Sequence, residues 1–162
     1  MIRSIIAIVV SFITVNLLIM ALFLVTAVVL GIEGTLRPGE YWTSTTFNVI
    51  VLAGGAVMSA LGGVVCALIA KSWRPALVVV GVILALGLVG AAQNLQKPDP
   101  PTRGDAVEGE TDRQYATRIL EEMMEVGKEP TWFSFATPFV GALAFLGGAR
   151  MVGDRRRRAI SP

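Results

Sequence analysis

Four long runs of apolar residues alternate with polar segments along the chain. They cover residues 5–32, 47–70, 75–92 and 132–152. The hydrocarbon core of a bilayer is about 30 Å thick, and a helix crosses it with roughly 17 to 25 apolar residues, or more when tilted. Each run is long enough, so the pattern predicts four transmembrane helices. The first run is also much longer than the core of a cleaved signal peptide, so we expect it to be retained.

A polar segment at residues 94–130 separates the third run from the fourth and predicts a loop outside the membrane. Within it, residues 112–126 have helical periodicity, with Thr111 as the N-cap and Gly127 at the end. One face of this short amphipathic helix is apolar: Tyr115, Ile119, Met123 and Val126. Such a face either rests on the bilayer or on the end of the bundle, or it docks a partner protein.

Composition supports a membrane protein. Of the 162 residues, 54% are hydrophobic and 16% are charged, and the mean hydropathy is +0.67. Soluble domains carry about 25% charged residues, so the surplus apolar surface must face lipid. We expect one all-α, polytopic membrane domain over residues 1–162, with the four spans in an antiparallel bundle.

Charge is divided unequally between the two sides of this bundle. One side has a net charge of +7, from Arg3, Lys71, Arg74, Arg150, Asp154 and Arg155–Arg158. The other side, which includes residues 94–130, has a net charge of −5. Lysine and arginine near helix ends mark the cytoplasmic side, so we expect both termini in the cytoplasm and the protein in the cell membrane.

The basic tail at residues 153–162 ends in an arginine run that anchors this topology: Arg155, Arg156, Arg157 and Arg158. The same run is a candidate contact for anionic lipid headgroups, worth about 1 kcal/mol per basic residue near the surface. Nucleic-acid binding would need more basic surface and aromatic stacking platforms, and it is not expected.

Residues 54–63 read GGAVMSALGG, which raises the question of a phosphate-binding loop. A P-loop needs a lysine followed by serine or threonine after its glycines, and here Val64, Val65 and Cys66 follow. On a helix, small residues recur every four positions instead: Gly55, Ser59, Gly63 and Ala67. Such a stripe lets two helices approach closely in a membrane. We expect it to pack against another span, and the four-residue turn at 71–74 makes the second and third spans neighbours.

The chain offers little for catalysis. It has no histidine and one cysteine, and we expect Cys66 to be a buried packing residue. Five acids lie in the distal half of the loop, but their spacing does not match a calcium-binding loop and predicts a solvated helix face: Asp112, Glu121, Glu122, Glu125 and Glu129. No catalytic, cofactor or metal site is predicted, and the protein is not expected to be an enzyme.

The spans hold few polar groups and no aspartate, glutamate, lysine or arginine in their interiors, which argues against an ion-coupled transporter. Asn16 is the most polar side chain of the first span. It either donates a hydrogen bond to another helix or lines a small polar pocket, and we expect the first.

Several packing and interface motifs resemble those of small, mostly uncharacterised four-helix integral membrane proteins of bacteria. They are the Ala70-Lys71 end of the second span, Trp73-Arg74-Pro75, Pro130-Thr131-Trp132-Phe133 and Gly147-Gly148-Ala149-Arg150. The resemblance implies a topology but no site. The resulting expectation is a protein that acts by contact, as an accessory, assembly or structural subunit bound to another membrane protein or to itself. The alternative is a bundle that binds or transports a lipid or small molecule without ion coupling.

Overall fold

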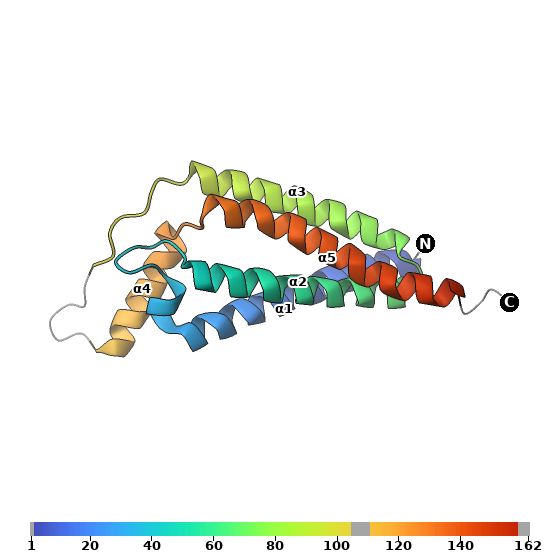
Figure 1. The fold of residues 1–162 in the computed structure, drawn as a ribbon, viewed down its shortest axis with the longest axis horizontal. Helices are drawn as coiled ribbons and strands as arrows, with labels where there is room; N and C mark the ends of the chain where they lie inside the picture. The colour runs from blue at the N-terminus through green and yellow to red at the C-terminus, as the bar shows by residue number, and fades with distance from the viewer. Residues whose placement is uncertain (1, 105–110, 159–162) are drawn as a thin grey trace.

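A computed structural model describes residues 2–104 and 111–158 of the chain. Five α-helices follow one another: α1 (Ile2–Thr35), α2 (Thr45–Ala70), α3 (Arg74–Gln96), α4 (Asp112–Val126) and α5 (Thr131–Arg158). Successive long helices run in opposite directions, so α1 and α3 point one way and α2 and α5 the other, and the short α4 crosses one end of them (Figure 1). The expected all-α architecture is confirmed.

Four of these helices are long and apolar enough to cross a membrane: α1, α2, α3 and residues 131–153 of α5. The protein is therefore a multi-pass membrane protein. All four long helices extend beyond the apolar runs at one or both ends, as α3 does by continuing to Gln96. Hydropathy marks the edge of the hydrocarbon, whereas backbone hydrogen bonds continue into the polar interface.

The last turn of α1 is set apart from the span by Gly31. This residue has φ 64° and ψ −173°, inside an otherwise helical segment. Glycine adopts positive φ without the steric cost that a Cβ imposes. The chain then turns into α2, where the Ser44 hydroxyl accepts a hydrogen bond from the Phe47 N–H at 3.1 Å. Ser44 is thus the N-cap of the second span.

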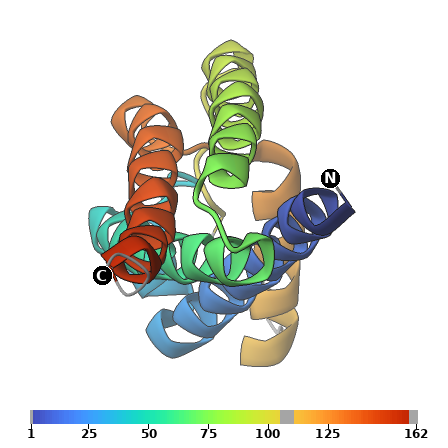
Figure 2. The same cartoon turned by 90° about the vertical axis from the view of Figure 1, so that its right-hand side faces the viewer.

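The helices are arranged around the bundle in the order α1, α2, α5, α3. The most extensive contacts join α2 to α5, α1 to α2 and α3 to α5, while α2 and α3 make few contacts. Figure 1 shows α5 lying between α2 and α3, and Figure 2 shows the same bundle viewed down its long axis. The expectation that the short turn makes the second and third spans close neighbours was therefore wrong, because the last span packs between them.

Small side chains allow α2 and α5 to touch closely. A Cβ atom on Gly63 would overlap the Phe145 carbonyl oxygen and lie 2.8 Å from the carbonyl carbon. A Cβ on Gly148 would overlap the Ala60 carbonyl oxygen in the same way. In lipid, such close packing replaces the hydrophobic driving force between helices. Cys66 is fully buried in the adjoining core, as expected.

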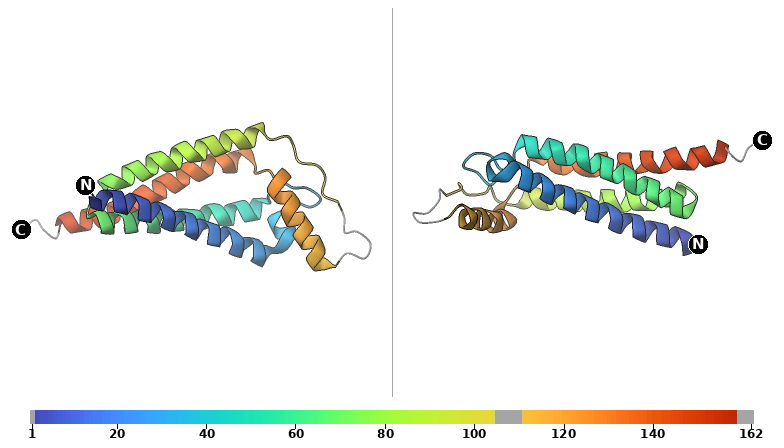
Figure 3. Two further views of the ribbon diagram at one scale, coloured as in Figure 1. Left: turned by 180° about the vertical axis from the view of Figure 1, so that it is seen from behind. Right: turned by 90° about the horizontal axis from the view of Figure 1, so that it is seen from below.

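At the other end of the bundle, α4 packs on the loop between α1 and α2 (Figure 3). Thr111 caps α4 by accepting from the Gln114 N–H at 3.4 Å, and Gln114 accepts in return from the Thr111 N–H at 3.0 Å. The loops also pair: Thr43 N–H donates to the Lys128 carbonyl at 3.2 Å. We call this end of the molecule the α4 end.

A buried hydrogen bond fastens α4 to the loop beneath it. Tyr41 is 3% exposed, and its hydroxyl donates to the Glu122 carboxylate. Burial, and then the bond to Glu122, raise the pKa of Tyr41 to about 12. A salt bridge of 2.5 Å between Arg103 and Glu33 ties the linker after α3 to the last turn of α1. The α4 end is therefore held together by hydrogen bonds and a salt bridge among three connecting segments.

Candidate ligand-binding cavity

A cavity of about 620 Å³ lies between α1 and α3 and is backed by α2 and α5. We call it the seam cavity, because α1 and α3 make few contacts and form the loosest seam of the bundle. Its volume lies within the roughly 300–1,000 Å³ of pockets that enclose small ligands. Two of its lining residues, Asn16 on α1 and Leu86 on α3, are exposed, so the seam is open to the membrane on this side.

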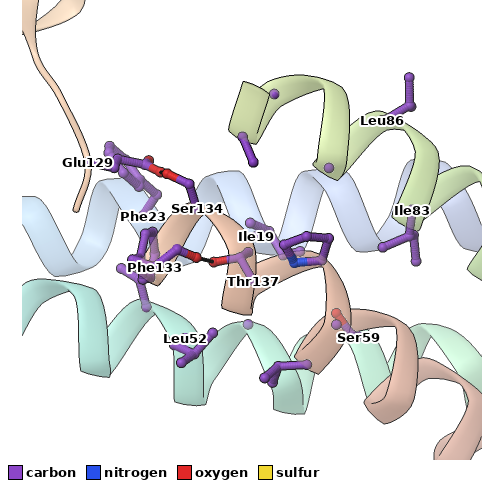
Figure 4. A pocket seen from close by; sticks show the side chains of 18 of the residues that line it. Ile19, Phe23, Leu52, Ser59, Ile83, Leu86, Glu129, Phe133, Ser134 and Thr137 are labelled. Atoms are coloured by element: carbon purple, nitrogen blue, oxygen red, sulfur yellow. Dashed lines mark hydrogen bonds between the residues drawn. The ribbon is translucent and has the colours of Figure 1, made fainter. Parts of the chain in front are cut away.

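The walls of the seam cavity are apolar along most of its length. They are built from aromatic and aliphatic side chains and from glycines, which leave room between the helices. Representative lining residues are Phe12, Ile19, Phe23, Leu52, Ile83, Leu86, Gly90 and Phe133, several of which are labelled in Figure 4. Such a lining excludes water and suits a hydrocarbon chain.

Polar groups gather at the α4 end of the cavity. The Asn94 amide on α3 donates to the Glu129 carbonyl at 2.8 Å and to the Ser134 hydroxyl at 2.9 Å. The Glu129 N–H donates back to the Asn94 side-chain oxygen at 3.3 Å, and the Ser134 hydroxyl donates to the Glu129 carboxylate at 3.3 Å. This polar mouth joins the end of α3 to the start of α5 and places a carboxylate above an apolar chamber (Figure 4).

Lys97 and Glu129 are the two charged residues that line the cavity. The Lys97 ammonium donates to the Gly127 carbonyl at 3.2 Å. Burial raises the pKa of the Glu129 carboxyl, while the Ser134 hydroxyl and the charge of Lys97 oppose that shift. Within the described part of the chain, Lys97 and Glu129 form no salt bridge with each other, and both residues line the cavity.

The raised pKa of Glu129 predicts a pH-dependent stability. The folded state holds the proton more tightly than the unfolded state, so this group's contribution falls as the pH rises from its ordinary value of 4.5 through the raised one. We expect the melting temperature of the wild type to fall progressively relative to that of Glu129→Gln as the pH rises above 4.5, until the folded-state carboxyl is fully ionised. Parallel profiles of the two proteins in detergent would contradict the shift.

The cavity is suited to binding and holds no evident catalytic apparatus. Among the residues that the structure describes, no three histidine, cysteine or acidic side chains are grouped as a metal site would require. The lining contains one carboxylate, one ammonium, hydroxyls and amides, but no thiol or imidazole. Chemically, the cavity offers hydrogen bonds and two opposite charges to a polar group, and an apolar channel to a hydrocarbon chain.

The predicted packing stripe divides between two roles. Gly63 meets α5, Ala67 is buried in the adjoining core, and Ser59 is 2% exposed and lines the cavity. Gly55 departs from the expectation: a Cβ there would meet nothing within 4 Å, and the residue lines the seam cavity. The close approach is made by the part of the stripe toward the Lys71 end, because α1 and α3 diverge at the level of Gly55 and leave space.

The apolar face of α4 is covered by the chain itself. Ile119 is 1% exposed and packs with Leu36 and Tyr41, and the other face residues pack around them: Tyr115, Met123 and Val126. Of the predicted alternatives, the face thus rests on the end of the bundle, and it is not free to dock a partner. Arg155–Arg158 belong to the last turns of α5, but their side chains lie outside the described part of the structure.

Comparison with known proteins adds no relative. A scan against protein-family models, a search of the curated proteins and a search of the solved structures each found no match. The resemblance to four-helix bacterial membrane proteins therefore stays a prediction from the sequence motifs.

The polar mouth was missed by reasoning from sequence. Glu129 was assigned to a solvated helix face, yet it lies after α4 and is partly buried against Asn94 and Ser134. Asn94 and Ser134 are 40 positions apart, and each is an ordinary polar residue near a helix end. Asn16 departs from the favoured expectation: its amide donates to the Phe12 carbonyl of its own helix at 2.8 Å and not to another helix, and it lines the seam cavity.

Proposed function

We propose that this membrane protein binds a membrane amphiphile in the seam cavity, with the hydrocarbon tail between α1 and α3 and the head at the polar mouth. The observation that carries the proposal is an apolar chamber of about 620 Å³ closed at one end by Asn94, Glu129 and Ser134. A soluble metabolite would not need the long apolar wall, and an ion would not need the volume.

The length of the cavity suits one leaflet of a bilayer. The lining of the cavity begins at Ile83 and continues to Lys97, and its part from Ile83 to Asn94, where the polar mouth begins, is about 16 Å long at 1.5 Å per residue of α3. Half of a hydrocarbon core about 30 Å thick is about 15 Å. The polar mouth lies next to Trp132, which is exposed at the start of α5 where an interfacial aromatic residue is favoured. A lipid in one leaflet would thus place its tail and its head where the cavity requires them.

The charges at the two ends of the bundle support an orientation with the termini in the cytoplasm. Lys71, Arg74 and Arg150 lie at the end opposite α4, and the Arg150 guanidinium stands 5.0 Å from the Trp73 ring. Lysine and arginine favour the cytoplasmic side. We propose a location in a bacterial cell membrane, with the polar mouth in the leaflet away from the cytoplasm and with no catalytic role.

Blocking the cavity tests the proposal. Gly55 and Gly90 both line the cavity, and a Cβ on either would meet nothing within 4 Å, so a side chain can be added there without a clash at Cβ, and phenylalanine is large enough to occupy part of the space. We expect Gly55→Phe and Gly90→Phe to keep the fold and to lower the lipid that copurifies in mild detergent by about tenfold, since a filled pocket no longer buries a ligand tail. Native mass spectrometry measures the bound lipid.

Gly81→Phe is the matched control. It lies on α3 with equally open space around it, but it does not line the cavity. Lipid retained by Gly55→Phe and Gly90→Phe at the level of this control would overturn the proposal. Copurification of a stoichiometric membrane protein that is lost in the cavity variants would show instead that the seam receives a partner's helix, which is the accessory role.

A further inference from the structure

The two charges at the polar mouth define the headgroup that it accepts, an inference that rests on the proposed function. Lys97 and Glu129 supply one cation and one anion at the same end of the cavity. Two hydrogen bonds join the end of α3 to the segment that contains Glu129. The Lys97 ammonium donates to the Gly127 carbonyl at 3.2 Å, and the Asn94 amide donates to the Glu129 carbonyl at 2.8 Å. Asn94 and Lys97, three residues apart, lie on neighbouring positions of one helix face.

The Glu129 carboxylate keeps an open acceptor. One carboxylate oxygen, Oε2, accepts from the Ser134 hydroxyl at 3.3 Å. Among the described residues, no group donates to the other oxygen, Oε1. A carboxylate at the edge of an apolar chamber gains most from a charge-assisted donor, and a primary ammonium offers three N–H groups.

The Lys97 ammonium completes the recognition. This group donates to a neutral carbonyl and, among the described residues, forms no salt bridge. A second basic residue, Lys128, lies close by and is already engaged: its ammonium donates to the Lys97 carbonyl at 2.9 Å, lies 2.9 Å from the Asp99 carboxylate and lies 5.2 Å from the centre of the Trp42 ring. A phosphate group would therefore meet Lys97, which acts as a point charge for it.

We propose that the seam cavity selects a zwitterionic lipid with a phosphoethanolamine headgroup, whose phosphate contacts Lys97 and whose ammonium donates to Glu129. An anionic lipid without the ammonium would leave Glu129 unpaired and would be repelled by it. A quaternary ammonium head carries the charge but has no N–H to donate, so it would bind more weakly.

The test uses the full-length protein in detergent and lipids with identical acyl chains and three heads: phosphoethanolamine, phosphocholine and phosphoglycerol. Native mass spectrometry with pairwise competition gives relative affinities. We expect the wild type to prefer phosphoethanolamine over phosphoglycerol by about tenfold, the size of one charge-assisted hydrogen bond. Glu129→Gln is expected to remove most of that preference, and Lys97→Met to weaken all three phosphate-bearing lipids.

Glu125→Gln is the control, because this acid is exposed on α4 and does not line the cavity. Equal affinity for the three heads, with binding still blocked by Gly90→Phe, would overturn the headgroup assignment and leave the lipid-binding function standing. Lipid that is bound equally by the wild type and by Gly90→Phe would overturn both. A preference for phosphoethanolamine that is unchanged in Glu129→Gln would show that this carboxylate does not recognise the headgroup.

Discussion

Gly148→Ala is expected to disrupt the bundle, although it adds a single methyl group. The new Cβ would overlap the carbonyl oxygen of Ala60 and lie 2.8 Å from its carbonyl carbon. Both are backbone atoms of α2, so relief requires the two helices to separate, and that separation would break the most extensive helix contact in the protein. Overpacking a tight site costs about 1–3 kcal/mol and occasionally more. Thermal unfolding in detergent should show a large loss of stability or no folded protein.

The neighbouring residue, Gly147, provides a control whose expected effect on stability is neutral or has the opposite sign. A Cβ on Gly147 would meet nothing within 4 Å. Because alanine is favoured over glycine inside a helix by about 0.5–1 kcal/mol, Gly147→Ala should be neutral or slightly stabilising. Gly63→Ala should behave like Gly148→Ala, since it faces the Phe145 carbonyl across the same contact. If Gly147→Ala and Gly148→Ala melted alike, the placement of α2 on α5 would be wrong.

Ile119→Ala is expected to release α4 from the end of the bundle. This side chain is 1% exposed and packs with Leu36 and Tyr41. Removing the buried methylene and methyl groups costs about 2–5 kcal/mol in a packed site. The membrane spans do not depend on this cluster, so the loss should appear as local opening of α4 while the bundle stays folded. Hydrogen exchange, measured for peptides of α4 and of α2, distinguishes local opening of α4 from unfolding of the bundle.

Leu120→Ala is the matched control, because the adjacent side chain is 52% exposed. A surface truncation of this kind changes stability by about 0.5 kcal/mol or less. We expect the exchange rate of α4 to rise at least tenfold in Ile119→Ala and to stay near the wild-type rate in Leu120→Ala. Equal exchange in the two variants would mean that the apolar face of α4 does not rest on the loop beneath it.

Local features of the fold could be predicted from sequence because their causes are local. The bounds of α4 follow from Thr111 as its cap and Gly127 at its end, and both positions behave as expected. The four spans follow from the length of the apolar runs. Which spans touch could not be predicted in the same way. Small residues permit close contact with any partner helix, and the turn after Lys71 links two helices without fixing what lies between them.

The cavity was beyond prediction for a related reason. The cavity exists where neighbouring helices do not touch. Gly55 and Gly63 belong to the same stripe of small residues, yet Gly55 lines the cavity and Gly63 contacts the backbone of α5. The polar mouth depends on segments that are 35 residues apart in the chain, as in the pair Asn94 and Glu129. No local pattern brings them together. Asn16 is the exception, since an amide on an otherwise apolar span signals either a partner or a pocket.

The position of α5 between α2 and α3 has a consequence for how the protein is made. The ribosome delivers α5 last, after the three other spans have entered the membrane. Until then, the glycine face of α2 has no helix to receive it, and α3 lacks its main neighbour. Before α5 enters, α1 and α2 can already pack together, whereas α3 has few contacts with either of them. A product truncated before Thr131 would keep three hydrophobic spans and lose the element that unites them, which makes it a natural substrate for membrane quality control.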